Sequence, residues 1–286
     1  MPSFTHNLFK FLIRLQGYPK KFETMVGAGG LKRHWPSKKT SEKHGVGKKV
    51  FEGFPFIWFD PSDGERQPGP VIALHGGGYV TEAQPPHLDV YAKLADLTGR
   101  RIYVPYYPLA PEHTPEQIHS WTRRFIDHVI EHNAGEPLLL TGDSAGANLA
   151  LLMVRDGVKA DRMVLWSPWV DVEMANPDLS INDGKCALLA HDSIEAIAGA
   201  YAGGVDRRSL SPAHFENEDL PPTLVLSGSH DLLHPDIELY AAKRAGQGAP
   251  VRLETAPKLF HDYMLIPSPE GRQALNRTAA FLNGTD

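Results

Sequence analysis

The sequence contains a single cysteine, no long hydrophobic run and no internal repeat or low-complexity tract. One cysteine, Cys186, excludes an intrachain disulfide framework and a zinc site built only from cysteines of one chain. No stretch reaches the roughly 18 consecutive apolar residues of a membrane-spanning helix. A net charge of −5 argues against general nucleic-acid binding, and a hydrophobic content of 42% argues against a mostly disordered chain. We therefore expect a folded protein without a transmembrane segment.

The first 50 residues are basic, with 11 Lys or Arg and two acids, whereas the rest of the chain is acidic. They also contain five apolar residues at helical spacing, which predict one apolar face of a helix: Phe4, Leu8, Phe11, Leu12 and Leu15. Three roles remain open for such a helix, namely covering a pocket, resting on an anionic membrane or acting as a transit peptide. The segment lacks the apolar core and cleavage site of a secretory signal, so we expect a cytoplasmic protein.

From about residue 50, short hydrophobic runs alternate with helical stretches. Residues 71–74, Val-Ile-Ala-Leu, form an apolar run typical of a strand buried on both faces. Other strands are predicted at residues 54–59, 102–107, 138–141, 163–166, 223–226 and 251–254. The alternation predicts an α/β fold whose largely parallel sheet is covered by helices on both faces.

One long interval, between Pro168 and Pro221, interrupts this alternation with polar, turn-rich sequence. An insertion directly after the carboxyl end of a strand lies where open α/β sheets bind ligands. We therefore divide the chain into an N-terminal segment, a core in two parts and an insertion: residues 1–48, 49–170 with 216–286, and 171–215.

The strongest chemical signal is the run Gly-Asp-Ser-Ala-Gly at residues 142–146, between a predicted strand and a helix of small residues. A sharp strand-to-helix turn places the Ser144 hydroxyl above the sheet, and the flanking glycines avoid backbone clashes. The N-terminus of the helix directs free N–H groups at the same position, which suits a developing oxyanion. The pattern indicates a nucleophilic serine; the alternative is an ordinary glycine-rich turn.

A second glycine-rich run, His75-Gly-Gly-Gly78, follows the buried strand at residues 71–74. In an acyl-transfer enzyme its exposed backbone N–H groups would stabilise an oxyanion opposite the nucleophile. His75 itself is better suited to hold this loop by a hydrogen bond than to transfer protons.

A nucleophilic serine needs a base, and the order of the chain selects one among 14 histidines. In this type of fold the nucleophile comes first, then the acid, then the histidine. Asp231 follows the predicted strand at 223–226, and His261 follows the last predicted strand. Both therefore lie at the carboxyl edge of the sheet together with Ser144. Asp236 and Asp262 are the fallback choices for the acid.

These motifs resemble the hormone-sensitive-lipase-like group of α/β-hydrolases, which includes many microbial carboxylesterases. The matching segments run in family order across roughly residues 70 to 265: His75-Gly-Gly-Gly-Tyr79, Tyr106-Tyr-Pro-Leu-Ala-Pro-Glu-His113, Gly142-Asp-Ser-Ala-Gly146, Ser167-Pro-Trp169, Ser211-Pro212, Asp231-Leu-Leu233 and His261. The resemblance implies the α/β-hydrolase fold with eight strands and a helical cap built from the N-terminal segment and the 171–215 insertion. It also implies that Gly77, Gly78 and Ala145 supply the oxyanion N–H groups. Because the family builds part of its cap from the N-terminal segment, we favour the pocket-covering role for the predicted helix and expect its apolar stripe to be the buried face.

The function that these residues predict is a serine carboxylesterase acting on short-to-medium acyl esters through Ser144, His261 and Asp231. Such chemistry needs no cofactor and no metal, and the expected partner is a small ester, with no nucleic acid; a homo-oligomer remains open. One alternative keeps the site but changes the reaction to that of an amidase, deacetylase or transacylase. Another is a ligand receptor on the same fold, which would have no need for an intact triad.

Two further patterns resemble other catalytic sites. His128-Val-Ile-Glu-His132 fits the H-x-x-E-H pattern of a zinc-binding helix, but the core side of that helix carries Trp121 and Phe125, and no third ligand is evident. Cys186 lacks the strand-turn-helix setting of a nucleophile. We therefore expect a surface pair of histidines and a packed cysteine.

Overall fold

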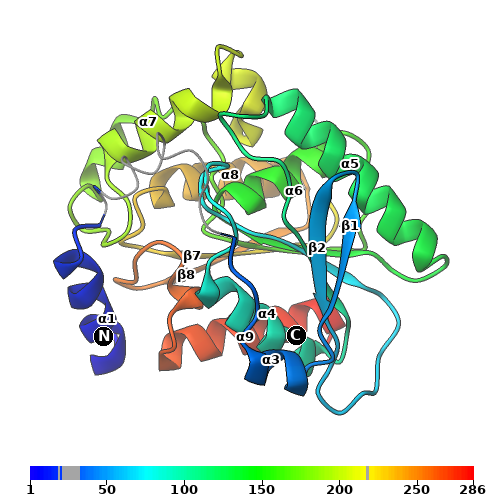
Figure 1. The fold of residues 1–286 in the computed structure, drawn as a ribbon. Coiled ribbons are helices and arrows are strands. Elements are labelled where there is room, and N and C mark those ends of the chain that lie inside the picture. Colours follow the sequence, from blue (N-terminus) through cyan, green and yellow to red (C-terminus); the bar gives the residue numbers. More distant parts are fainter. Residues whose placement is uncertain (19, 21–32, 217–218) are drawn as a thin grey trace.

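The computed structural model describes residues 1–18, 20, 33–216 and 219–286, and an eight-stranded β-sheet lies at its centre (Figure 1). The strand order is β1-β2-β4-β3-β5-β6-β7-β8; β2 is antiparallel to both of its neighbours, and all other pairs are parallel. The strands are β1 (Gly47–Phe51), β2 (Phe54–Phe59), β3 (Val71–Leu74), β4 (Ile102–Pro105), β5 (Leu139–Asp143), β6 (Arg162–Trp166), β7 (Thr223–Gly228) and β8 (Val251–Ala256). The predicted eight-stranded, mostly parallel sheet is confirmed.

Strand β3 illustrates why the central strands are apolar at every position. All four of its residues are buried. Ile72 and Leu74 contribute to one hydrophobic core, and Val71 and Ala73 contribute to another. Successive side chains of a strand point to opposite faces, so a sheet covered on both sides requires apolar residues without alternation.

Helices on the two faces bury these two cores (Figure 1). One face is covered by α4 (Pro85–Thr98) and α9 (Pro269–Asn283), and the other by α5 (Pro115–His132), α6 (Ala145–Arg155) and α8 (His234–Gly246). The shorter elements are α3 (Lys38–Lys43), α7 (His191–Ala202), η1 (Pro177–Ile181), η2 (Arg207–Leu210), η3 (Pro212–His214) and η4 (Tyr263–Leu265).

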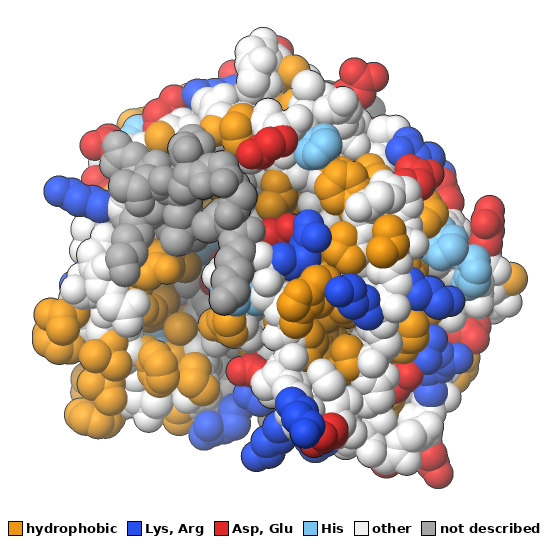
Figure 2. Space-filling model, in the orientation of Figure 1, with side chains coloured by type: hydrophobic (Ala, Val, Ile, Leu, Met, Phe, Trp, Pro, Cys, Tyr) orange, Lys and Arg blue, Asp and Glu red, His pale blue; other side chains and the backbone are white. Residues whose placement is uncertain are grey.

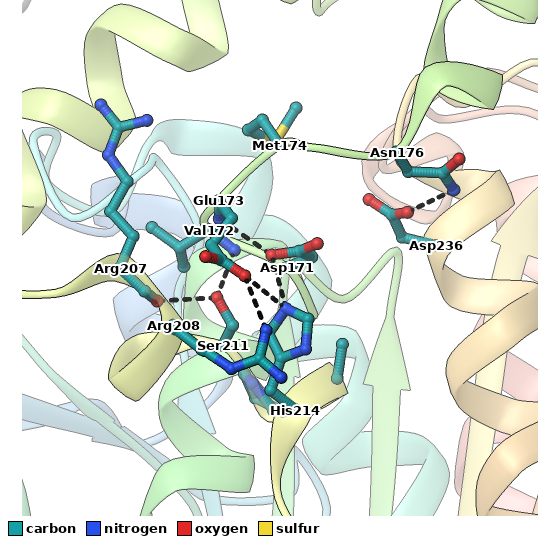
Figure 3. Close-up of polar contacts among 12 residues, drawn as sticks. Asp171, Val172, Glu173, Met174, Asn176, Arg207, Arg208, Ser211, His214 and Asp236 are labelled. Carbon is teal, nitrogen blue, oxygen red and sulfur yellow. Dashed lines mark hydrogen bonds and ion pairs between the residues drawn. The ribbon is translucent and has the colours of Figure 1, made fainter.

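The 171–215 insertion consists of α7, η1, η2 and η3 joined by irregular backbone, and polar contacts tie its two ends together (Figure 3). The backbone N–H of Val172 donates to Oγ of Ser211 at 2.8 Å. Nε2 of His214 lies 2.7 Å from Oε2 of Glu173 and 3.5 Å from Oδ1 of Asp171. We call Asp171, Glu173 and His214 the neck cluster, because they close the base of the insertion.

The predicted N-terminal helix is present as α1 (Phe4–Leu15), but its orientation differs from the expectation. The five apolar residues of the predicted stripe are exposed, from 38% for Leu12 to 82% for Phe4, and hydrophobic side chains gather on the surface at α1 (Figure 2). The opposite face turns inward instead: His6 is buried, and Phe9 and Ile13 line a cavity. The prediction that this apolar stripe is the buried face of the helix is therefore wrong. Much of the remaining N-terminal segment, residue 19 and residues 21–32, lies outside the described residues.

Contacts at both ends of α1 hold it against the body of the protein. Oγ of Ser3, the N-cap residue, donates to Oε2 of Glu270 at 2.7 Å, at the start of α9. Arg14 donates to the backbone carbonyl of Gly184 in the insertion. In the part of the chain that the structure describes, neither α1 nor any other helix is long and apolar enough to cross a membrane.

Candidate active site

Ser144 lies at the sharp turn between β5 and α6. Its φ of 51° and ψ of −115° place a non-glycine residue in a strained backbone conformation, as expected for a serine turned out from the end of a strand. The turn also requires close backbone packing, because a Cβ atom on Gly146 would lie 2.0 Å from the carbonyl oxygen of Leu74. The local sequence therefore fixes Ser144 above the carboxyl edge of the sheet.

A cavity of about 330 Å³ opens at Ser144. Its polar part contains Ser144, His261, Asp262 and the backbone of Gly77 and Gly78. Its walls are mainly apolar and include residues from α1 and the insertion: Phe9, Ile13, Leu188, Leu189, Ile194 and Ile197. A second cavity of similar size lies beside β8 and α9 but contains none of the predicted site residues. Four of the six predicted site residues, Ser144, His261, Gly77 and Gly78, thus line this cavity, whereas Asp231 and Ala145 are not among its lining residues.

His261 and Asp231 come from neighbouring loops, which follow β8 and β7. Nδ1 of His261 lies 2.9 Å and 3.0 Å from the two carboxylate oxygens of Asp231, and both residues are buried. The amide of Asn182, in the insertion, donates to the backbone carbonyl of Asp231 at 2.8 Å. Asp231 therefore contacts the imidazole on the side away from Nε2.

The other imidazole nitrogen of His261 contacts a second acid. Nε2 lies 3.1 Å from Oδ2 of Asp262, and among the described residues no hydrogen bond joins Nε2 to Oγ of Ser144. Burial opposes a charge on His261, but the two neighbouring carboxylates outweigh it and raise the pKa of the imidazole well above its ordinary value of 6.5. The structure thus places His261 between two acids.

Gly77 and Gly78 lie on the loop after β3, facing the cavity. The φ of Gly77 is 111°, and a Cβ atom there would lie 2.0 Å from Oγ1 of Thr81, so this conformation requires glycine. His75 stacks on Tyr107 with ring centroids 4.4 Å apart, and its Nδ1 lies 2.8 Å from the carbonyl oxygen of Gly76. Burial lowers the pKa of His75 to about 4, so it is neutral near pH 7 and suited to brace this loop.

One buried network beside the site was not predicted. Nε2 of His87, in the first turn of α4, lies 3.0 Å from Oδ2 of Asp143, and the hydroxyl of Tyr91 donates to Oδ1 of the same carboxylate at 3.1 Å. Burial lowers the pKa of His87, but Asp143 more than offsets it and leaves the pKa raised. The only sequence signal was the acid in the Gly-Asp-Ser-Ala-Gly run; nothing marked His87 as its partner.

The remaining candidates lie away from the cavity. Oδ1 of Asp236 accepts a hydrogen bond from Asn176 at 2.6 Å, and burial raises the pKa of Asp236 to about 6. The rings of His128 and His132 lie 4.1 Å apart and are tilted by 50° near the C-terminal end of α5. The candidate metal-ligand group in the described part of the chain is the neck cluster instead. Cys186 is buried and accepts a hydrogen bond from the backbone of Leu189.

Comparisons with known proteins agree with this arrangement. A family model described as the alpha/beta hydrolase fold matches residues 71–265. The acetyl-hydrolase of Streptomyces hygroscopicus is 30% identical over 236 residues, which cover 79% of this chain and 78% of that protein. The esterase of Acinetobacter venetianus is 27% identical over 76% of this chain and 75% of its own length.

A solved structure has the same fold. An esterase from the bacterial hormone-sensitive lipase family superposes with a TM-score of 0.85 at 24% identity, covering 100% of this chain and 99% of that chain. The family model and the relatives confirm the predicted resemblance to an α/β-hydrolase esterase. The chain belongs to the α/β-hydrolase family and is a carboxylic-ester hydrolase.

Proposed function

We propose that the chain is a serine carboxylesterase for short-to-medium acyl esters, with Ser144 as nucleophile, His261 as base and Asp231 as the acid that orients the base. The observation that carries this proposal is the meeting of Ser144, His261 and the glycine loop at one cavity, with the carboxylate of Asp231 against Nδ1 of the imidazole. The names of two relatives, acetyl-hydrolase and esterase, support the ester class.

In the proposed reaction, Nε2 of His261 takes the hydroxyl proton of Ser144 as Oγ attacks the ester carbonyl carbon. The carbonyl oxygen becomes an oxyanion, which backbone N–H groups of Gly77, Gly78 and Ala145 stabilise. The imidazolium then gives its proton to the departing alcohol, which leaves Ser144 acylated. Water attacks the acyl-enzyme, His261 takes a proton from that water, and Ser144 is regenerated as the acid departs.

The size and lining of the cavity support small acyl groups. A volume of about 330 Å³ is at the lower end for small-molecule sites, and aliphatic side chains from the insertion favour an acyl chain over a charged group. Because α1 and the insertion both contribute to this lining, changes in either segment would alter the preferred acyl length.

A panel of chromogenic esters with graded acyl length tests the proposal. We expect the highest kcat/KM for short-to-medium chains, and a loss of several orders of magnitude in kcat for Ser144→Ala, with about 10³–10⁴-fold catalysis over water remaining. A fluorophosphonate probe should label the wild-type protein at Ser144. Activity of Ser144→Ala within about tenfold of wild type would move the nucleophile elsewhere.

The same reagents distinguish the alternatives. A higher kcat/KM on a matched amide, or acyl transfer to an added alcohol in preference to water, would favour an amidase or a transacylase. A protein that binds esters but neither hydrolyses them nor reacts with the probe would be a receptor.

A further inference from the structure

Asp262 is a buried acid at the cavity that the proposed reaction does not use. Its Oδ2 lies 3.1 Å from Nε2 of His261, the nitrogen that must accept the proton of Ser144. Its Oδ1 is buried and has no hydrogen-bond partner among the described residues. Asp262 therefore competes with Ser144 for the hydrogen bond to Nε2 of His261.

The backbone holds Asp262 in this position. Its φ of 53° and ψ of 37° lie in the left-handed region, where Asp, Asn and Gly are the residues most readily accommodated. Its N–H donates to Oγ of Ser167 at 3.2 Å, and its carbonyl accepts from the N–H of Leu265 at 3.0 Å. Anchored at both sides, the side chain is directed toward the imidazole rather than into solvent.

We propose that Asp262 is a positioning residue that binds the protonated Nε2 of His261 in the resting enzyme and must release it before Ser144 can be activated. This inference rests on the proposed function, because it assigns Asp262 a role only if His261 is the base. In the resting pair one proton lies between Nε2 and Oδ2. That proton departs to solvent, and the freed Nε2 lone pair then accepts the proton of Ser144.

The surrounding charges favour a single shared proton. Asp262 faces His261 on its own loop, Asp231 on the loop after β7, Asp143 at the end of β5 and His87 on α4. Burial, followed by the two neighbouring carboxylates, raises the pKa of Asp262 to about 7, although the imidazole of His261 opposes this shift. Because the pKa of His261 is raised, Nε2 holds its proton near neutral pH and loses it as the pH rises.

The pH dependence of catalysis provides the test. The base must lose the shared proton, so kcat/KM should rise with pH along an acid limb set by the pKa of His261. Removing the negative charge of Asp262 removes one cause that raises this pKa, so the acid limb should move to lower pH. A charge at hydrogen-bond distance typically shifts a pKa by about 1–3 units. One unit below the wild-type midpoint, a shift of about one unit corresponds to roughly a fivefold increase in kcat/KM.

Two substitutions suit this position. Asp262→Asn keeps the shape and removes the charge, and Asp262→Gly removes the side chain while tolerating the left-handed backbone. We expect both variants to show the acid limb at lower pH and higher activity at mildly acidic pH. Asp236→Asn is the matched control, since Asp236 is also a buried acid with a raised pKa but contacts Asn176 rather than His261. Its acid limb should coincide with that of wild type.

A direct titration separates this inference from the proposed function. In the inactive Ser144→Ala background, NMR can follow the imidazole of His261 with and without Asp262→Asn. A lower pKa of His261 in the double variant supports the contact whether or not the chain is an esterase. An unchanged pKa and an unmoved acid limb would overturn the inference. Loss of activity at every pH in a folded Asp262→Gly protein would also overturn it, by making Asp262 a required support of the base.

Discussion

Two sites in the described part of the molecule combine one histidine with two carboxylates, and they differ in almost everything else. His261 lies 2.9 Å from Asp231 and 3.1 Å from Asp262, and its side chain is 2% exposed. In the neck cluster, His214 lies 2.7 Å from Glu173 and 3.5 Å from Asp171, and its side chain is 25% exposed (Figure 3). The residue types and distances are similar, so they cannot by themselves identify the catalytic site.

The surroundings separate the two sites. His261 faces the cavity that contains Ser144, and burial strengthens its interactions with the two acids. His214 links the two ends of the insertion, and Glu173 has an additional cation nearby, because Arg208 lies 3.5 Å from it. The first arrangement suits the proposed proton transfer, whereas the second holds backbone segments together. The molecule thus illustrates that a histidine becomes a candidate base through its access to a nucleophile.

Replacing each histidine with alanine should give the largest contrast. His261→Ala removes the base, and loss of a triad histidine in another serine hydrolase costs about 10⁶-fold in kcat. His214→Ala should leave kcat on a short ester within about threefold of wild type, because His214 contacts neither the cavity nor Ser144. Initial rates on one chromogenic ester, with circular dichroism to check folding, measure both. Comparable losses in the two folded variants would contradict the division between a catalytic and a structural cluster.

The acids should give a smaller contrast in the same direction. Asp231→Asn keeps the shape but leaves Nδ1 facing an amide, which favours the wrong tautomer and should lower kcat by about 10⁴-fold. Glu173→Gln at the neck should have little effect on kcat. The two variants are matched because each replaces a carboxylate by its amide beside a histidine. Full activity of Asp231→Asn together with a large loss for Asp262→Asn would transfer the orienting role to Asp262.

The positions of the proposed catalytic residues could be predicted from sequence because local rules place them at one edge of the sheet. Gly146 permits the close turn at Ser144, and Asp231 and His261 follow strands whose carboxyl ends must meet at one edge of a parallel sheet. The contact of Asp262 with Nε2 could not be predicted in this way. It depends on a left-handed backbone conformation directly after His261 and on the hydroxyl of Ser167, from another strand end, that holds it.

Helix α1 shows a different limit of sequence reasoning. Helical spacing correctly placed Phe4, Leu8 and Leu15 on one face, but periodicity does not say what that face packs against. The inward face carries its own apolar residues, Phe9 and Ile13, and the position of α1 is set by remote contacts such as that of Ser3 with Glu270. Orientation was therefore decided by tertiary contacts that leave no local pattern.

The smallest expected effect concerns metal ions at the neck cluster, where ligand atoms of Asp171, Glu173 and His214 all lie within 4.8 Å of one another. His214 and Arg208 already pair with Glu173, and zinc would have to displace the 2.7 Å contact between His214 and Glu173. Partly exposed ion pairs of this kind contribute about 0–1 kcal/mol to the free energy of unfolding. Replacing the ion pair by a bound zinc ion should therefore change the stability little.

We expect zinc chloride to leave the Tm unchanged and EDTA to leave the pH profile of ester hydrolysis unchanged. A saturable rise in Tm with zinc that disappears in His214→Ala would instead make the neck cluster a metal site. A loss of activity with EDTA that zinc restores, and that His128→Ala reproduces, would reinstate the histidine pair on α5.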